Sequence, residues 1–214
     1  MKIHLVVFDL DGTIVRSHEN IYKAMIASLL KLNIFVNVDK EKFYQMIGAH
    51  FEDIFKEMNI PVSDFNVFIK YYKEFYFHFI DSSILYPNVK ETIKLLNENG
   101  IKVALLTTKA QDQAELNLKH FKMIEMFNYV MGRRPGLGHK PSPEPLLKIC
   151  EDLGVSPIET IIVGDSELDI LCGKSAGSRT CAVTYGYRTR EELEKHTPDF
   201  VIDDFAEIID VINS

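Results

Sequence analysis

Two aspartates near the amino terminus, Asp9 and Asp11, have the type and spacing of a reactive carboxylate pair. They follow the apolar run IHLVVF, and in extended backbone two side chains that are two residues apart project to the same side. Gly12 follows them and permits a sharp exit of the chain. A third aspartate, Asp165, follows a second apolar run, TIIVG. We interpret Asp9, Asp11 and Asp165 as an oxygen-lined metal site of the kind that Mg²⁺ prefers.

The same pair of aspartates could divide the work of a phosphoryl transfer. Asp9 could attack phosphorus as a nucleophile and form an acyl phosphate. Asp11 could then protonate the leaving oxygen and later take a proton from water. A phosphoryl group in transfer also needs hydroxyl donors and compact positive charge. We assign these roles to Thr107 and Thr108 in LLTTK and to Lys140 in HKPSPEP.

Residues beside these motifs receive supporting roles. Asp169 lies four residues after Asp165, so the two can share a helical face, and Asp169 could hold a metal-bound water or fix Lys140. The supporting residues are Gly12, Thr13, Ser166 and Asp169. The side chains that could contact the rest of a substrate are Arg16, His18, His50 and Lys109.

The elements around these motifs alternate between strands and helices, which explains how distant residues could meet. Strands are predicted over 3–8, 101–107, 128–131, 160–164, 179–184 and 200–202, with helices between most of them and a last helix from about 204. This order predicts an α/β fold with a Rossmann-like, doubly wound parallel sheet. The carboxyl ends of parallel strands form one edge, where ligands bind in such sheets. Asp9, Thr107 and Asp165 should therefore lie together.

Residues 18–80 interrupt this alternation, because their apolar spacing is helical. One expected face carries Ile21, Tyr22, Met25, Ile26, Leu29 and Leu30, and an aromatic stripe covers 65–79. We interpret the stripe as a buried packing face. The expected domains are an α/β core over 1–14 and 86–214 and an inserted small all-helical cap over 15–85, with hinges near 14–17 and 81–88.

Composition narrows the classes of partner and compartment. The net charge of −7 argues against nucleic acid and against an anionic membrane, because both favour a clustered basic face. The three cysteines lack metal-ligand spacing and fit reduced thiols. The first residues resemble neither a signal peptide nor a membrane span, which predicts a cytoplasmic protein. The expected partner is a small phosphorylated metabolite, and the oligomeric state stays open.

Taken in order, the segments DLDGT, LLTTK, HKPSPEP and VGDSELD resemble the motifs of the haloacid dehalogenase-like hydrolase superfamily. The stretches YPNVKETIKLLNENGIKVALLTTK and KPSPEPLLKICEDLGV resemble its phosphoglycolate phosphatase-like branch. The resemblance implies Mg²⁺-dependent hydrolysis of a phosphate monoester through an aspartyl phosphate. It also implies that the backbone carbonyl of Asp11 joins the metal ligands, and that the insertion is the helical cap.

Two other functions stay open on the sequence. One is a sugar phosphomutase of the β-phosphoglucomutase type, which would pass the phosphoryl group to a sugar hydroxyl instead of water. The other is a non-catalytic domain that binds a phosphorylated ligand, although the presence of Asp9, Asp11, Lys140 and Asp165 argues against it. A dehalogenase is disfavoured, because Asp11 suits phosphoryl transfer.

Overall fold

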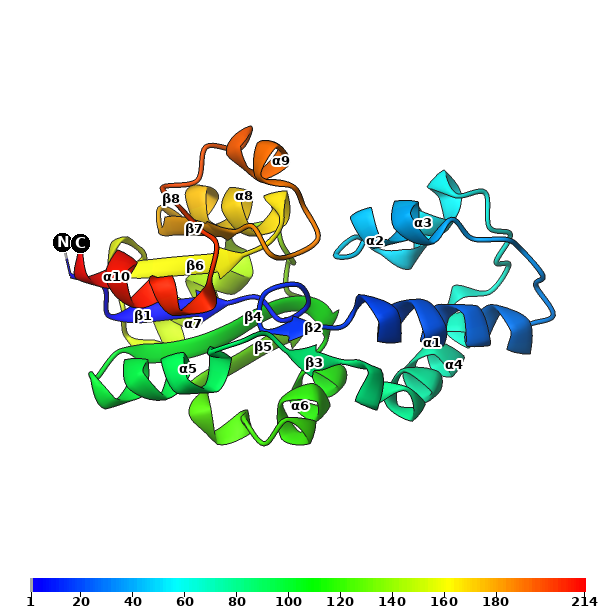
Figure 1. Cartoon of the computed structure of the whole chain (residues 1–214), viewed down its shortest axis with the longest axis horizontal. Helices are drawn as coiled ribbons and strands as arrows, with labels where there is room; N and C mark the ends of the chain where they lie inside the picture. Colours follow the sequence, from blue (N-terminus) through cyan, green and yellow to red (C-terminus); the bar gives the residue numbers. More distant parts are fainter. Residues whose placement is uncertain (1) are drawn as a thin grey trace. The chain divides into compact units, whose positions relative to one another are not determined.

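The structure is a computed structural model that describes residues 2–214, and the chain divides into two compact units. Met1–Val15 and Leu85–Ser214 form one unit, here called the sheet unit. Arg16–Ile84 form the other, here called the helical unit. Figure 1 shows the elements of both units.

The sheet unit contains a six-stranded parallel sheet in the order β5-β4-β1-β6-β7-β8. Its strands are β1 (Leu5–Phe8), β4 (Lys102–Ala110), β5 (Tyr129–Arg133), β6 (Thr160–Gly164), β7 (Arg179–Val183) and β8 (Phe200–Ile202). Its α-helices are α5 (Val89–Glu98), α6 (Gln111–His120), α7 (Glu144–Leu153), α8 (Glu167–Ala176), α9 (Arg190–Glu194) and α10 (Ile208–Asn213). Short 3-10 turns are η2 (Ile124–Met126), η3 (Pro157–Glu159) and η4 (Phe205–Glu207).

Both faces of the sheet are covered by helices, as the continuous apolar strands predict. In the central strand β1, Val6 and Phe8 pack with residues of α5, α6 and α10, whereas Leu5 and Val7 pack with residues of α7 and α8. Each face therefore has its own apolar core. The doubly wound α/β fold predicted from the sequence is confirmed.

The expected strand over 101–107 is longer in the structure, because β4 continues to Ala110. Its pairing with β5 is irregular between Leu106 and Ala110. Thr107, Thr108 and Lys109 lie in this irregular segment, so an extended but locally distorted backbone carries them.

The helical unit is built from α1 (His18–Lys31), α2 (Lys40–Gln45), α3 (Phe51–Glu57), α4 (Phe65–His78) and the turn η1 (Ile80–Ser82). The long helices α1 and α4 pack on each other. Two short strands, β2 (Val15–Arg16) and β3 (Ile84–Leu85), form a two-stranded sheet where the chain passes between the units. The all-helical character predicted for the insertion is confirmed.

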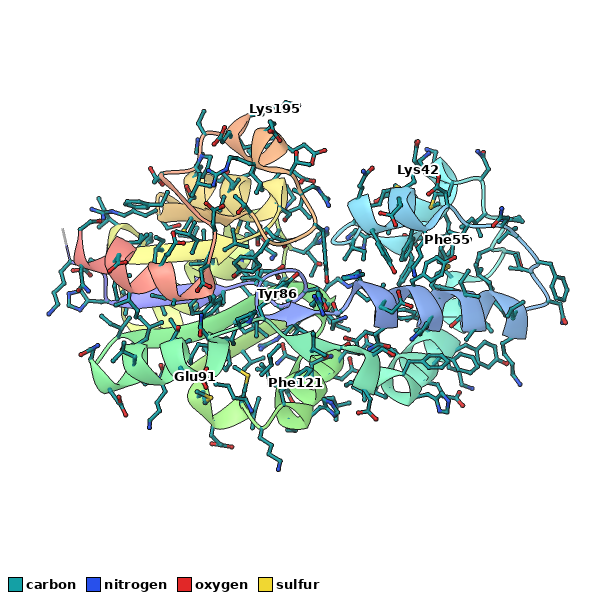
Figure 2. All side chains as sticks on the ribbon, viewed as in Figure 1. Lys42, Phe55, Tyr86, Glu91, Phe121 and Lys195 are labelled. Carbon is teal, nitrogen blue, oxygen red and sulfur yellow. The ribbon has the colours of Figure 1, made fainter. Side chains whose placement is uncertain are left out.

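The aromatic stripe of α4 contributes to the core of the helical unit. Phe68, Tyr72 and Tyr76 are buried, and Phe55 of α3, labelled in Figure 2, packs edge-on against Phe68 with ring centroids 4.8 Å apart. The expected face of α1 is wrong at its end, because Leu30 is 51% exposed. The buried face of α1 includes Ala24 and Ser28, whose small side chains permit close helix packing.

Candidate active site

The register of the parallel strands brings three motifs to one edge of the sheet unit. Phe8 pairs with Leu105 of β4 on one side and with Val163 of β6 on the other. The backbone N–H of Asp9 donates to the carbonyl of Val163 at 2.9 Å. One or two residues beyond this row come Asp9, Thr107 and Asp165. Because their strands are parallel neighbours, all three residues lie at the same edge of the sheet.

Lys140 joins two of the carboxylates at this edge. Its Nζ lies 2.8 Å from Oδ1 of Asp9 and 2.5 Å from Oδ1 of Asp169. The other oxygen of Asp169, Oδ2, accepts hydrogen bonds from the hydroxyl and the backbone N–H of Ser166, at 2.6 and 3.2 Å. These contacts complete a capping box at the start of α8. Asp169 therefore fixes both Lys140 and the helix that follows Asp165.

Asp9, Asp165 and Asp169 form a buried carboxylate cluster in which one oxygen of each lies within 4.8 Å of the others. Burial raises the pKa of Asp9 to about 7, against the opposing effect of Lys140. Burial also raises the pKa of Asp165 well above its usual range, and the charges of Asp9 and Asp169 add to this rise. Ionising the cluster is therefore costly without additional positive charge.

Charge balance shows what kind of ion would fit the cluster. Burial alone would lower the pKa of Lys140, but Asp169 and Asp9 outweigh it and raise that pKa, so Lys140 is an ammonium. When all three carboxylates are ionised, the cluster and this single ammonium together have a net charge of two negative units. A divalent cation would restore neutrality, and carboxylate oxygens suit a hard ion. The donor set therefore fits a metal site.

Asp165 is enclosed by glycines and by backbone. Its Oδ2 accepts a hydrogen bond of 2.8 Å from the backbone N–H of Tyr187, in the loop after β7. A Cβ at Gly186 would lie 2.2 Å from the Cβ of Asp165, and one at Gly12 would lie 2.1 Å from its Oδ2. Gly12 also has a φ of +88°, which disfavours other residues. The sequence reasoning missed Gly186 and Tyr187, although a glycine just after a strand at the ligand-binding edge is a usable signal.

The Asp11 carboxylate lies outside this cluster and has a cation of its own. Its Oδ2 is 3.1 Å from Nζ of Lys109, and the side chains are 13% and 6% exposed. The metal-ligand set predicted from the sequence consists of Asp9, Asp11 and Asp165. In the structure, the carboxylate that lies with Asp9 and Asp165 is that of Asp169, not that of Asp11. Side-chain direction after a strand depends on the turn, and here Asp11 forms a bridge with Val15 instead of continuing β1.

The remaining predicted residues of the sheet unit lie around these groups. Thr107 is buried, and its hydroxyl accepts from the backbone N–H of Lys109 at 3.2 Å. Thr108 is half-buried beside it. Thr13 is fully buried, its carbonyl accepts from the hydroxyl of Tyr185 at 3.2 Å, and among the described residues its own hydroxyl has no hydrogen-bond partner.

Arg16, His18 and His50 belong to the helical unit, so their contact with a substrate stays a prediction. Arg16 is exposed, and His18 and His50 are half-buried. The ring of His18 packs edge-on against Tyr44 at 4.6 Å. The Tyr44 hydroxyl donates to Glu19 at 2.6 Å, which ties α2 to α1.

The chain thus combines a doubly wound parallel sheet, an edge of that sheet with buried carboxylates and an ammonium, and a helical insertion after the first strand. The family model described as haloacid dehalogenase-like hydrolase matches residues 6–183. The chain belongs to this family. The family assignment made from its motifs is confirmed, and the protein is a hydrolase.

Individual relatives resemble the chain over its whole length. Pyrophosphatase PpaX of Bacillus cereus (strain AH820) is 34% identical over 214 residues, covering 100% of this chain and 98% of the relative. Phosphoglycolate phosphatase of Haemophilus influenzae is 31% identical over 222 residues, covering 99% of each. Both relatives are phosphatases by name.

Solved structures show the same fold. The crystal structure described as a predicted phosphoglycolate phosphatase from Haemophilus somnus 129pt has a TM-score of 0.85 and 28% identity, covering 99% of this chain and 98% of that one. A haloacid dehalogenase-like family hydrolase from Streptococcus pneumoniae has a TM-score of 0.86 at 22% identity, covering 98% of each chain. Within residues 2–214, no helix combines the length and the apolarity that crossing a membrane requires.

Proposed function

We propose that the protein is a Mg²⁺-dependent phosphatase that hydrolyses a small phosphorylated metabolite through an aspartyl phosphate on Asp9. The observation that carries this proposal is the ammonium of Lys140, which lies 2.8 Å from Oδ1 of Asp9 beside a cluster of three buried carboxylates. This arrangement suits an anionic phosphoryl group that must approach a carboxylate nucleophile together with a divalent ion.

The metal would be held by Asp9 and Asp165, with Asp169 adjacent, and by the backbone carbonyl of Asp11 that the family resemblance implies. Bound there, Mg²⁺ would offset negative charge and favour in-line approach of the phosphoryl group. Gly12 and Gly186 leave room for Asp165 in this position, and the Tyr187 N–H orients its carboxylate. Asp169 keeps Lys140 directed at the nucleophile.

The chain's own residues divide the reaction between them. An oxygen of Asp9 attacks phosphorus, the bond from phosphorus to the leaving oxygen breaks, and Asp11 gives that oxygen a proton. Asp11 then takes a proton from the water that hydrolyses the acyl phosphate. Lys140 and the hydroxyl groups of Thr107 and Thr108 bind the phosphoryl oxygens throughout. Side chains of the helical unit would bind the remainder of the substrate and so determine specificity. The candidates are Arg16, His18 and His50.

The substrate we propose is a small phosphate ester or anhydride. The relatives named pyrophosphatase and phosphoglycolate phosphatase support inorganic pyrophosphate and 2-phosphoglycolate as the first compounds to test. Both are small, so neither needs a large binding surface.

The test separates the two steps in the Asp11→Asn variant. With p-nitrophenyl phosphate, the leaving phenolate needs little acid, so formation of the phosphoenzyme should survive better than its hydrolysis. Because general acid–base assistance is typically worth about 10²–10⁴-fold, a burst near one equivalent of p-nitrophenolate should precede a much slower steady state. Rapid-mixing absorbance measures the burst, and mass spectrometry of acid-quenched protein locates the phosphate.

Matched variants control this experiment. Asp9→Asn should give no burst and no adduct. Asp152→Asn removes an exposed carboxylate that pairs with Lys148 outside the site, and should behave as the wild type. Isomerised sugar phosphate without released phosphate would point to a mutase. No turnover of any ester with Mg²⁺, and no adduct on Asp9, would refute the proposed function.

A further inference from the structure

The loop that follows β7 makes two contacts at the edge of the sheet that carries the candidate site, and the proposed function uses only one of them. The N–H of Tyr187 donates to the Asp165 carboxylate. Two residues earlier in the loop, the hydroxyl of Tyr185 donates a 3.2 Å hydrogen bond to the backbone carbonyl of Thr13. Thr13 is 172 positions away, in the turn that follows β1. The second contact therefore ties the loop to the chain segment just after the nucleophile.

The side chain of Tyr185 is held in place, so its hydroxyl is a defined anchor. Its ring lies against the ring of Tyr86, which is labelled in Figure 2, with 4.6 Å between the ring centroids. Both rings pack against the apolar core that contains Phe8. Burial raises the pKa of Tyr185 far above its ordinary value of 10, so the hydroxyl stays protonated and donates.

The contact between Tyr185 and Thr13 closes a ring of chain around Asp165. On one side the loop lies directly behind this side chain, because a Cβ at Gly186 would be 2.2 Å from the Cβ of Asp165. On the other side lies the turn after β1, because a Cβ at Gly12 would be 2.1 Å from Oδ2 of Asp165. Tyr185 and Thr13 are the sequence neighbours of these two glycines, so their hydrogen bond joins the two sides. Asp165 is thereby enclosed between two linked backbone segments.

We propose that Tyr185 is a positioning residue for Asp165, and that the ring it closes makes the metal site prefer Mg²⁺ to the larger Ca²⁺. This inference rests on the proposed function, which makes Asp165 a metal ligand. Mg²⁺ requires oxygen ligands at about 2.0–2.1 Å in nearly octahedral geometry, whereas Ca²⁺ takes them at about 2.3–2.6 Å in variable geometry. A larger ion needs its carboxylates to move outward, and the backbone at Gly12 and Gly186 leaves Asp165 no room to do so. The enclosure therefore penalises Ca²⁺.

Calorimetric titration of the metal-free protein with Mg²⁺ and with Ca²⁺ tests this proposal without any substrate. Tyr185→Phe removes only the hydroxyl, so the ring still packs against the core. Because one hydrogen bond typically contributes a factor on the order of 2–10, we expect the Kd for Mg²⁺ to rise about fivefold. The Kd for Ca²⁺ should stay the same or fall, because a released loop lets Asp165 move outward. The preference for Mg²⁺, expressed as the ratio of the two Kd values, should therefore fall about fivefold or more.

Tyr129→Phe is the matched control. Tyr129 is the first residue of β5, at the end of the strand away from the site, and its hydroxyl donates to Asp152 at 2.7 Å. This variant loses a hydrogen bond of the same kind, but both Kd values should equal those of the wild type.

A double variant distinguishes positioning from a general effect on stability. Gly186→Ala already displaces the loop, so adding Tyr185→Phe to it should change the Kd for Mg²⁺ less than the same substitution does in the wild type. Residues that act through one shared element are non-additive in this way, whereas independent effects add.

The outcomes separate this inference from the proposed function. An unchanged ratio of the two Kd values in Tyr185→Phe would overturn the role of Tyr185, and so would an equal fold-change in the wild-type and Gly186→Ala backgrounds. Wild-type protein that binds Mg²⁺ but hydrolyses no phosphate ester would refute the proposed function alone, because the role of Tyr185 is measured by metal binding.

Discussion

The backbone N–H of Tyr187 donates a 2.8 Å hydrogen bond to Oδ2 of Asp165. The two residues come from different loops at the carboxyl edge of the sheet, one after β7 and the other after β6. The contact is possible because Gly186 has no side chain to hold the loop away from Asp165. Arg188 fastens the same loop through an ion pair with Glu167 of α8, at 3.0 Å. The loop after β7 is thus part of the proposed metal site.

Gly186→Ala should weaken metal binding. The added Cβ would meet the Cβ of Asp165 at 2.2 Å, and neither atom is the end of a flexible side chain, so the loop or the carboxylate must move. We expect the Mg²⁺ concentration for half-maximal activity to rise about tenfold or more, because orienting contacts around a metal are typically worth 10–100-fold in affinity. Titration of activity with Mg²⁺ and calorimetric Mg²⁺ binding both measure this effect.

The control for this variant is Gly136→Ala. Gly136 has a φ of +78° and no atom within 4 Å of an added Cβ, so the substitution strains the backbone without touching the site. It should lower stability slightly and leave the Mg²⁺ requirement unchanged. An equal Mg²⁺ requirement in both variants would contradict the role given to the loop.

Lys140→Met should destabilise the metal-free protein strongly. The substitution leaves three carboxylates within 4.8 Å of one another without their ammonium. Removing one partner of a buried ion pair costs about 3–5 kcal/mol, and Mg²⁺ should recover part of this loss by supplying positive charge. Urea unfolding in chelator and in Mg²⁺ measures both effects. The exposed Lys148, paired with Asp152, gives the control Lys148→Met, which should unfold like the wild type in both conditions.

The stabilising effect of Mg²⁺ should increase with pH. Burial raises the pKa of Asp9 from 3.8 to about 7, so in chelator its contribution to stability is complete below pH 3.8 and is lost as the pH rises through about 7. The pKa of Asp165 shifts in the same direction. Mg²⁺ binds the ionised carboxylates. It should therefore stabilise the protein most at high pH, where the metal-free protein has lost the most stability.

Melting curves in Mg²⁺ and in chelator at pH 5, 6.5 and 8 measure this difference. At a concentration about 100 times Kd, we expect Mg²⁺ to add roughly 5–10 °C at pH 8 and little at pH 5. In the Asp165→Asn variant, the rise in melting temperature caused by Mg²⁺ should be small at every pH. A larger increment at pH 5 than at pH 8 would contradict the assignment of the cluster.

Phe68→Ala should loosen the helical unit more than the sheet unit. Phe68 is fully buried and packs against Phe51, Phe55 and Tyr72. Truncating a buried phenylalanine costs about 3–5 kcal/mol, and 16–84 form a compact unit of their own. Hydrogen exchange should therefore accelerate within 16–84 far more than in the strands β1, β4 and β6. Phe65→Ala, at a half-buried position of the same helix, should have a smaller effect.

The sequence by itself was sufficient to predict the class of fold and the edge of the sheet that carries the candidate chemistry. Strands such as IHLVVF and TIIVG are apolar at nearly every position, which indicates burial on both faces and hence a parallel sheet covered by helices. Parallel strands have their carboxyl ends at one edge, so the sequence alone predicts that Asp9, Thr107 and Asp165 lie together. The helical insertion was visible from its change of apolar period.

Only the tertiary structure decided which side chains meet at that edge. Asp169 joins Asp9 and Asp165, whereas the Asp11 side chain pairs with Lys109. These choices depend on how the backbone turns after each strand, and apolar periodicity carries no information about such turns. The contact between Asp165 and Tyr187 joins residues 22 positions apart, and it requires β7 to lie next to β6. Strand order of this kind is set by the packing of the whole sheet, so no local pattern could have specified it.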